Sequence, residues 1–496
     1  MPKRDPSKDP STKSAAYQAM EGKWRKVSTV LEGTEAMREA GQNYLPRHER
    51  ESGENYSERL RSNVLFNSSK ITLEGWTTRP FQNLVQASVP DALSEVMKDV
   101  DSQGNSATVF ARRWFREGLA KAFAHVLVEF PPGPDAPQTL ADDRAANKKP
   151  YWCFVPPENL IFAASEMENG REILTHVRMV ETEVVRVGFA EMSVERIRVY
   201  DRVRVEGGTQ VQVTLWRKVD KRTSKDQDWV MDGPPRFLEG MDEIPLVTFY
   251  ADRTGLMQGV PPLEELVDLN IRWWQSNSDQ ISVLTVARFP ILAGSGISEE
   301  DSEKEIGPKK FLWTPDSQGR YYYVEHAGRA IEAGRLDLLD LEDRMSAYGA
   351  QFLRKKPGDQ TATERALDSA ESTSQLKDAV VRFNDSLSEV LRLTGKWVKI
   401  DEPGTVKVPT DFGPGSTEAF DLQALQEARR MGEISRERFL AELKRRGLLA
   451  DDFDGEADAV VLAAEVKKGL VANPSRNPPS KQPKDGRDED GESEAG

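Results

Sequence analysis

The sequence predicts an α+β protein that is mainly helical and contains several long helices. Apolar residues recur every three or four positions over long stretches on both sides of the middle of the chain, which is typical of amphipathic helices. Short runs with a two-residue period fill residues 151–250 and predict antiparallel strands. With 496 residues, the chain is long enough for roughly two to four domains of ordinary size.

The N-terminal part of the chain predicts helices followed by a strand. A polar, proline-rich arm (residues 1–13) precedes a predicted helix over 14–40. A second helical pattern covers 56–66, after a break at Pro46. The segment 110–128 predicts an amphipathic helix that runs into an apolar strand ending near Phe130.

The strand-rich segment is read from its alternation of apolar and polar residues. The predicted strands, with glycine pairs and Asp-Gly marking turns between them, cover 173–180, 197–200, 211–216 and 244–250. We expect them to form one α+β region together with the helices that precede them.

Two long helices are predicted around a short mixed insert. The first covers 263–288, although its middle, 275–280, is wholly polar. The second covers 332–355 and carries an apolar seam at alternating spacings of three and four residues: Leu338, Leu341, Met345, Tyr348 and Phe352. Such a seam predicts packing against another helix, and we expect it to lie between subunits of an assembly.

A third, very long helix is predicted over 361–399. Its seam consists of Leu376, Val380, Phe383, Leu387, Val390 and Trp397. After a Pro/Gly-rich link, shorter helices are predicted over 417–431, 436–446 and 455–468, with Ser435 as an N-cap. The tail, 473–496, has too few apolar residues to order itself.

The chemistry-bearing residues do not predict an enzyme. No phosphate-binding glycine loop or dinucleotide fingerprint is present, so we expect no cofactor. The four histidines are widely spaced and Cys153 is the one cysteine, so we expect no metal site and no catalytic residue. Cys153 and His125 lie among apolar residues and are read as core positions.

Charge and hydropathy restrict the partners. The net charge of −14 argues against tight non-specific DNA binding, which depends on neutralising phosphates, but it is compatible with DNA that slides past without sticking. No run of 18 apolar residues occurs, so we expect no membrane partner. One basic group, Arg354, Lys355 and Lys356, ends the second long helix. One interpretation is that these positive charges complement the dipole at the C-terminus of the helix. The other is that several copies, arranged around an axis, form a basic ring that faces a polyanion.

Several stretches together resemble the portal proteins of tailed bacteriophages, the head-to-tail connectors. They are 56–67 (YSERLRSNVLFN), 72–81 (TLEGWTTRPF), 262–272 (PLEELVDLNIR), 276–279 and 287–292. The order of elements agrees over about residues 45–470: mixed region, helix, small mixed insert, helix, loop, very long helix and helical C-terminus.

The resemblance implies a wing, stem, clip and crown architecture. Residues 1–45 would be an N-terminal arm and helix, 46–262 the wing, 263–288 and 332–355 the two stem helices, and 289–331 the clip. The tunnel loop and long wing helix would occupy 356–400, a helical crown 401–472, and a disordered tail 473–496. Arg354, Lys355 and Lys356, where the second stem helix meets the tunnel loop, would face DNA.

The resemblance also implies a function and partners. The chain would assemble in the host cytoplasm as a homododecameric ring and would lie at one capsid vertex of the virion. Double-stranded DNA would pass through its channel during packaging and ejection. The large terminase subunit, a head–tail adaptor, the major capsid protein and a scaffold would be its protein partners.

Two alternatives belong to other classes. One is a phage-associated nuclease or hydrolase whose carboxylate site forms only in the folded chain. The other is a helical scaffold or adaptor protein. The missing nucleotide and metal motifs count against the first, and the strand-rich segment counts against the second.

Overall fold

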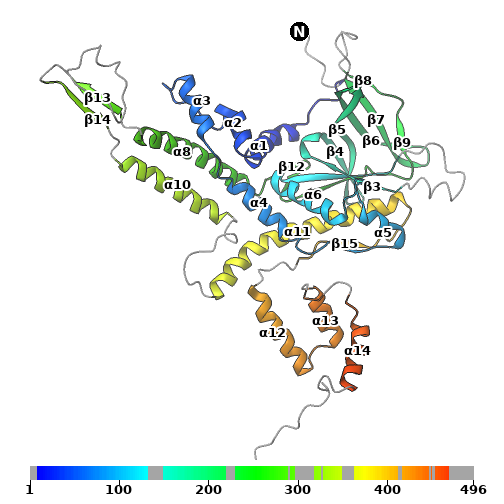
Figure 1. Ribbon diagram of the computed structural model, residues 1–496. Helices are drawn as coiled ribbons and strands as arrows, with labels where there is room; N and C mark the ends of the chain where they lie inside the picture. Colours follow the sequence, from blue (N-terminus) through cyan, green and yellow to red (C-terminus); the bar gives the residue numbers. More distant parts are fainter. Residues whose placement is uncertain are drawn as a thin grey trace, which may run out of the picture. The chain divides into compact units, whose positions relative to one another are not determined.

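The computed structural model (Figure 1) shows helices combined with antiparallel sheets, which confirms the predicted α+β class. It describes residues 8–131, 149–218, 229–288, 291–295, 318–324, 328–348, 362–410, 416–445, 448–449 and 453–467. The chain divides into two compact units, Met1–Gly413 and Pro414–Gly496, and each is considered by itself. Within the described residues, none of the helices combines the length and the apolar character needed to span a membrane.

The first unit begins with helices. They are α1 (Ala15–Glu32), α2 (Thr34–Ala40), α3 (Gly53–Ser62), α4 (Ser68–Thr78), α5 (Asp91–Lys98) and α6 (Ala107–Lys121), with a 3₁₀ turn η2 (Gly41–Asn43). The hydroxyl of Ser14 caps α1 by accepting a hydrogen bond from the Tyr17 amide at 3.1 Å. Gly33, at φ 101°, separates α1 from α2, so the helix predicted over 14–40 is divided.

A three-stranded sheet lies directly after α6. Its strand order is β10 (Leu246–Tyr250), β2 (Phe123–Glu129) and β3 (Tyr151–Val155), all antiparallel. The α6–β2 transition follows the predicted one. Gly118 of α6 lets the helix approach this sheet, because a Cβ there would lie 2.3 Å from Cδ1 of Phe249.

A larger sheet accounts for most of the remaining strand-rich segment. Its order is β4 (Leu160–Glu168), β5 (Arg171–Val187), β6 (Ala190–Val205), β7 (Gly208–Lys218) and β8 (Trp229–Met231), with β9 (Arg236–Leu238) also paired to β7. The 3₁₀ turn η3 (Pro157–Asn159) precedes it. The predicted strands 173–180, 197–200 and 211–216 are confirmed as the central parts of longer strands.

Two small strand pairs complete the body of this unit. β11 (Arg253–Gly255) pairs with β12 (Gln258–Gly259), and β1 (Gln86–Ser88) pairs with β15 (Thr405–Lys407). The second pair ties the segment after the long helix back to the N-terminal half. Residues 405–407 therefore belong to the first unit, although the sequence placed 401–472 in a separate helical crown.

The long helices and the insert appear in the predicted order. They are α8 (Glu264–Arg288), the hairpin of β13 (Ile291–Ser295) and β14 (Arg320–Val324), α10 (Arg329–Ala347) and α11 (Ala362–Trp397). The described part of the second long helix ends at Ala347, and the predicted extension to residue 355 lies outside the described residues. The amide of Tyr348 bonds back to the Met345 carbonyl, a three-residue turn that closes α10.

The core of this unit is centred on aromatic rings. Phe383 of α11 lies at ring-centroid distances of 5.0 Å from Trp114, 5.1 Å from Phe115 and 4.9 Å from Phe249. Edge-to-face contacts of this kind add to the stabilisation from apolar burial. The helix α11 is therefore joined to both α6 and β10 through one buried cluster.

The second unit contains α12 (Ser416–Met431), α13 (Arg436–Arg445) and α14 (Gly455–Lys467), close to the predicted bounds. Ser435 caps α13 as predicted, since its Oγ accepts from the Arg438 amide at 3.1 Å. Asp454 does the same for α14, accepting from the amides of Glu456 and Ala457 at 2.9 and 3.2 Å. Asp454 is thus the N-cap of α14.

Candidate functional site

Helices α8 and α10 form an antiparallel pair that carries the β13–β14 hairpin at its end (Figure 1). The amide of Gln280 donates to the Ile331 carbonyl at 2.9 Å, and the indole of Trp273 donates to Glu342 at 3.2 Å. Glu265 and Tyr348 form a further hydrogen bond between the two helices. As the α8 residue number rises, its α10 partner number falls, which defines the antiparallel arrangement.

The seam predicted on the second long helix is only partly an exposed surface. Leu341 and Met345 are buried in the chain's own core, and Leu338 is partly buried against it. Leu341 and Met345 were expected to be buried between subunits. Packing within one chain already buries both side chains. Tyr348 is 43% exposed, and Phe352 lies outside the described residues.

A different apolar surface of α10 is open. Leu336 and Leu339 are 49% and 42% exposed, and their spacing of three residues puts them side by side on the helix. Of the described α10 side chains, Leu341 and Met345 are the buried ones. Most of this helix is thus not covered by the part of the chain that the structure describes.

The polar middle of α8 packs against the N-terminal part of the chain. Gln275 donates to the Tyr44 carbonyl at 3.0 Å, and Asn277 donates to Oδ1 of Asn63 at 2.8 Å. Ser278 is fully buried. Gln275, Asn277, Ser278 and Gln280 are therefore hydrogen-bonded within the chain, which accounts for much of the polarity of this stretch, while Asp279 remains exposed.

Arg59 is the centre of this polar contact. Its guanidinium donates to both oxygens of Glu51 at 2.8 and 2.9 Å, to the Pro46 carbonyl at 2.8 Å and to Ser278 Oγ at 3.2 Å. The Arg59 hydrogen bonds hold the pKa of Glu51 below its ordinary value. Both side chains are almost completely buried, so the ion pair fixes α3 to the segment before it, while the Arg59–Ser278 hydrogen bond joins α3 to α8.

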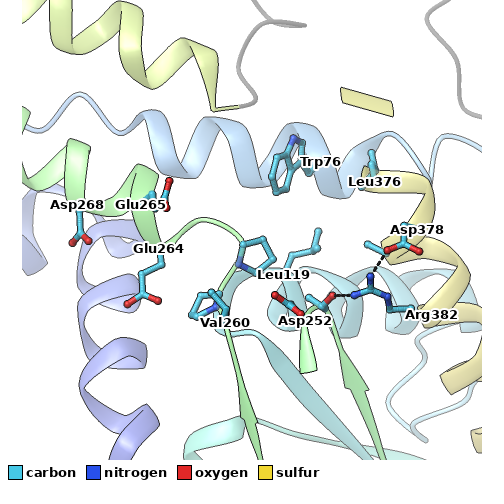
Figure 2. A pocket seen from close by; sticks show the side chains of 14 residues that line it. Trp76, Leu119, Asp252, Val260, Glu264, Glu265, Asp268, Leu376, Asp378 and Arg382 are labelled. Atoms are coloured by element: carbon cyan, nitrogen blue, oxygen red, sulfur yellow. Dashed lines mark hydrogen bonds and ion pairs between the residues drawn. The ribbon is translucent and has the colours of Figure 1, made fainter. Parts of the chain in front are cut away.

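A hollow lies between α4, α6, α8 and α11, with a volume of about 630 Å³ (Figure 2). Eight lining residues have apolar side chains: Trp76, Leu119, Ala251, Val260, Pro261, Pro262, Leu376 and Ala379. The other six are charged: Asp252, Glu264, Glu265, Asp268, Asp378 and Arg382. Figure 2 shows Arg382 bonded to Asp378 and to the Ala251 carbonyl.

This acidic hollow is the place in the described chain where a carboxylate-based catalytic site is best sought. Four of its five carboxylates, however, have hydrogen-bond or ion-pair partners. Glu264 pairs with Lys23 at 2.9 Å and Asp268 with Lys26 at 2.7 Å, both from α1. Among the described residues, no group of three or more acidic, histidine or cysteine side chains is arranged to hold a metal ion.

Cys153 lies in a polar cluster that the sequence does not reveal. Its Sγ is 3.7 Å from Glu129, which also accepts hydrogen bonds from Tyr151 and Tyr200 at 3.0 Å each and pairs with Arg198. Burial and then the Glu129 carboxylate raise the pKa of Cys153 to about 12. The thiol is thus held protonated, which is the opposite of the thiolate that a nucleophile requires.

His125 is a core residue, as predicted. It is fully buried on β2, and its Nδ1 lies 2.9 Å from the hydroxyl of Thr248 on the neighbouring strand. Burial lowers the pKa of His125 to about 3, so the ring is neutral. The basic group Arg354, Lys355 and Lys356 lies outside the described residues.

Comparisons with known proteins found a match to one family model and similarity to solved structures, two of which are described below. The sequence matches a family described as a domain of unknown function (DUF4055) over residues 262–398, which span α8, the β13–β14 hairpin, α10 and α11. None of the curated proteins matches the sequence.

The two solved structures are parts of particles. One is the neck of a native GTA particle computed with C12 symmetry, at 10% identity and TM-score 0.39, covering 76% of this chain and 88% of that chain. The other is the neck of an empty GTA particle computed with C6 symmetry, at 10% identity and TM-score 0.39, covering 80% and 89%. A TM-score of 0.39 supports no argument about this chain.

Proposed function

We propose that the chain is one subunit of a portal ring of a tailed bacteriophage, through which double-stranded DNA passes. The proposed ring is a homododecamer at one capsid vertex. The large terminase subunit would dock on it during packaging, and the head–tail adaptor later. The major capsid protein and a scaffold would be its other partners.

The observation that carries the proposal is the succession of α8, the β13–β14 hairpin, α10 and α11 after an α+β body. That succession corresponds to the stem, clip, stem and long wing helix implied by the sequence resemblance. The helix pair is antiparallel, so the hairpin between its members lies at one end of the pair, where a docking protein can reach it.

The exposure of α10 supports assembly with other copies. Leu336 and Leu339 remain open to solvent on a helix that its own chain covers on one side. Burying such side chains removes apolar surface from water and is favourable. Helix pairs standing side by side in a ring would supply that burial.

The charge balance supports a passive conduit. A net charge of −14 disfavours trapping a polyanion along the wall of a channel. Arg354, Lys355 and Lys356 would then form a local attractive belt in the assembled ring. We propose that the chain has no catalytic activity. The protonated Cys153 thiol and the paired carboxylates of the hollow are consistent with that proposal.

Native mass spectrometry with negative-stain imaging tests the ring. We expect a species of about twelve times the 55.7 kDa subunit mass, with a central hole. Single subunits at every concentration, also with vertex partners supplied, would contradict the proposal. Turnover of a substrate by the purified chain would favour the enzyme alternative, and rod-shaped particles would favour the scaffold alternative.

Charge reversal tests the basic belt. We expect the triple variant Arg354→Glu, Lys355→Glu and Lys356→Glu to assemble normally but to package or retain less DNA. A matched control reverses three exposed basic residues elsewhere, namely Lys70, Arg204 and Lys407, with the same change in net charge. Equal DNA packaging by the two triple variants would show that the belt has no special role.

A further inference from the structure

The hairpin of β5 and β6 extends beyond the sheet to which it belongs. β4 pairs with β5 no further along than Met179, and β7 pairs with β6 no nearer to the hairpin turn than Arg196. The remaining residues, 181–187 and 190–195, have only each other as strand partners in the described chain. We call this two-stranded extension the ribbon; ribbons of two strands are marginally stable on their own.

One face of the ribbon is apolar. Residues directly opposite each other in an antiparallel pair share a face, and Val187 lies opposite Ala190 while Val185 lies opposite Met192. Val194 continues the same face but lies opposite Glu183, which pairs with Arg196, so the apolar part of this face is confined to the end of the ribbon near the turn. The other face carries Thr182, Val184, Arg186, Glu191, Ser193 and Glu195 and is mostly polar.

The turn adds an aromatic ring to the end of the ribbon. Gly188, at φ 65°, and Phe189 form the two-residue turn between Val187 and Ala190, and glycine readily takes such a backbone conformation. Phe189 has an exposed fraction of 105%, so its ring contacts no other part of its own chain. Val187 and Met192 beside it are also more than half exposed.

The same unit contains a hollow that could receive an aromatic ring, the one between α4, α6, α8 and α11, whose wall is partly apolar and partly acidic. Its volume of about 630 Å³ lies within the range of roughly 300–1,000 Å³ that is typical of binding pockets. Leu119, Leu376 and Ala379 form buried apolar parts of its wall, and Val260 is an exposed apolar part. Four of its five carboxylates already have hydrogen-bond or ion-pair partners: Glu264, Glu265, Asp268 and Asp378.

We propose that the ribbon of one copy inserts Phe189 into the hollow of a neighbouring copy. The inference rests on the proposed function in so far as it requires several copies. A contact between two different surfaces of identical chains is head-to-tail, and such contacts close into rings when the rotation permits. The paired charges around the hollow need not be stripped of their partners when an apolar side chain enters.

A second copy is the occupant that the molecule itself suggests. The full exposure of Phe189 shows that the ribbon does not fill the hollow of its own chain. Within the described residues, each chain therefore offers one exposed apolar projection and one hollow with a partly apolar wall, in the one-to-one ratio that a ring requires. A different protein docking on the ribbon would leave the hollow without a counterpart.

The first experiment compares Phe189→Asp with Met167→Asp by native mass spectrometry and sedimentation. Met167 is 71% exposed on β4, outside the ribbon, and serves as the matched control. We expect Phe189→Asp to raise the concentration needed for half-maximal assembly by roughly tenfold to hundredfold, which corresponds to the loss of one buried aromatic side chain. Circular dichroism of the subunit should not change, because Phe189 contacts nothing within its chain.

The second experiment locates the contact by cross-linking. Phe189→Cys combined with Val260→Cys should be joined between subunits by a short bismaleimide in the assembled protein, whereas Met167→Cys with Val260→Cys should not. Cys153 gives little background, because its raised pKa keeps the thiol protonated. The joined product would migrate as a covalent dimer or higher ladder.

The outcomes separate this inference from the proposed ring. Rings that form equally well with Phe189→Asp and give no ribbon-to-hollow cross-link would overturn the inference and leave the ring intact. A wild-type chain that remains a single subunit under all conditions would overturn both.

Discussion

Helices α10 and α11 carry similar apolar seams but use them differently. In α11, the seam residues Leu376, Val380, Phe383, Leu387 and Val390 are all buried within the chain. In α10, Leu341 and Met345 are buried, while Leu336 and Leu339 on another side remain open. Equal periodicity therefore leads to one helix enclosed by its own fold and one that is only anchored at part of its length.

The surroundings of the two helices explain the contrast. α11 packs against β10 and β2 through Phe383 and the rings around it. It is also held by charge, because Arg392 and Lys396 each lie 2.8 Å from Glu243, in the loop before β10. α10 has α8 as its main neighbour in the described chain, and hydrogen bonds from Gln280 and Trp273 join the two helices.

The largest expected effect comes from truncating the centre of the α11 seam. Phe383→Ala should lower the free energy of unfolding by about 3–5 kcal/mol, because a buried ring with four aromatic neighbours leaves a cavity. Val381→Ala, on the exposed side of the same helix, should change it by less than about 0.5 kcal/mol. Urea unfolding followed by tryptophan fluorescence measures both, and equal effects would contradict the burial described for α11.

A smaller effect on the free energy of unfolding is expected for α10, and it should differ between the two sides of this helix. Met345→Ala should lower the free energy of unfolding of the dissociated subunit by about 2–4 kcal/mol, because Met345 is fully buried. Leu339→Ala should leave that quantity within about 0.5 kcal/mol but should weaken assembly in native mass spectra. Should Leu339→Ala destabilise the subunit as much as Met345→Ala, the side assigned here to neighbouring copies would instead be packed within the chain.

Periodicity was sufficient to predict the long helices and the strand-rich region, but it did not predict α4 or α5. The order of the long helices, the α6–β2 transition and the strand-rich region all follow from it. It could not predict what a seam packs against. The spacings of Leu338, Leu341 and Met345 are the same whether the partner helix belongs to the same chain or to another, and here α8 of the same chain lies next to them.

The polar sites were beyond the reach of the sequence for a different reason. Residues 275–280 are polar and suggest exposure, yet their partners Tyr44, Arg59 and Asn63 lie more than 200 positions earlier in the chain. The hollow likewise collects side chains from four helices, and no local motif connects them. Such sites become visible only when the fold brings distant segments together.

The smallest effect tests the charge that holds α11. Burial by itself would raise the pKa of Glu243, but hydrogen bonds from Arg392 and Lys396 outweigh it and lower the pKa to about 2. Because the pKa is lower in the folded than in the unfolded chain, the stabilisation is present above pH 4.5 and is lost as the pH falls towards 2. We therefore expect Glu243→Gln to lower the free energy of unfolding at pH 7 by about 1–3 kcal/mol.

The pH dependence distinguishes this ion pair from a general loss of packing. The difference between wild type and Glu243→Gln should shrink steadily between pH 4.5 and 2 in urea unfolding measured at each pH. Asp242→Asn is the matched control, since Asp242 also pairs with Lys396 but is 62% exposed and should contribute little. A difference for Glu243→Gln that stays constant over this range would mean that its ionic contact does not stabilise α11, and burial of the seam alone would then account for the contrast with α10.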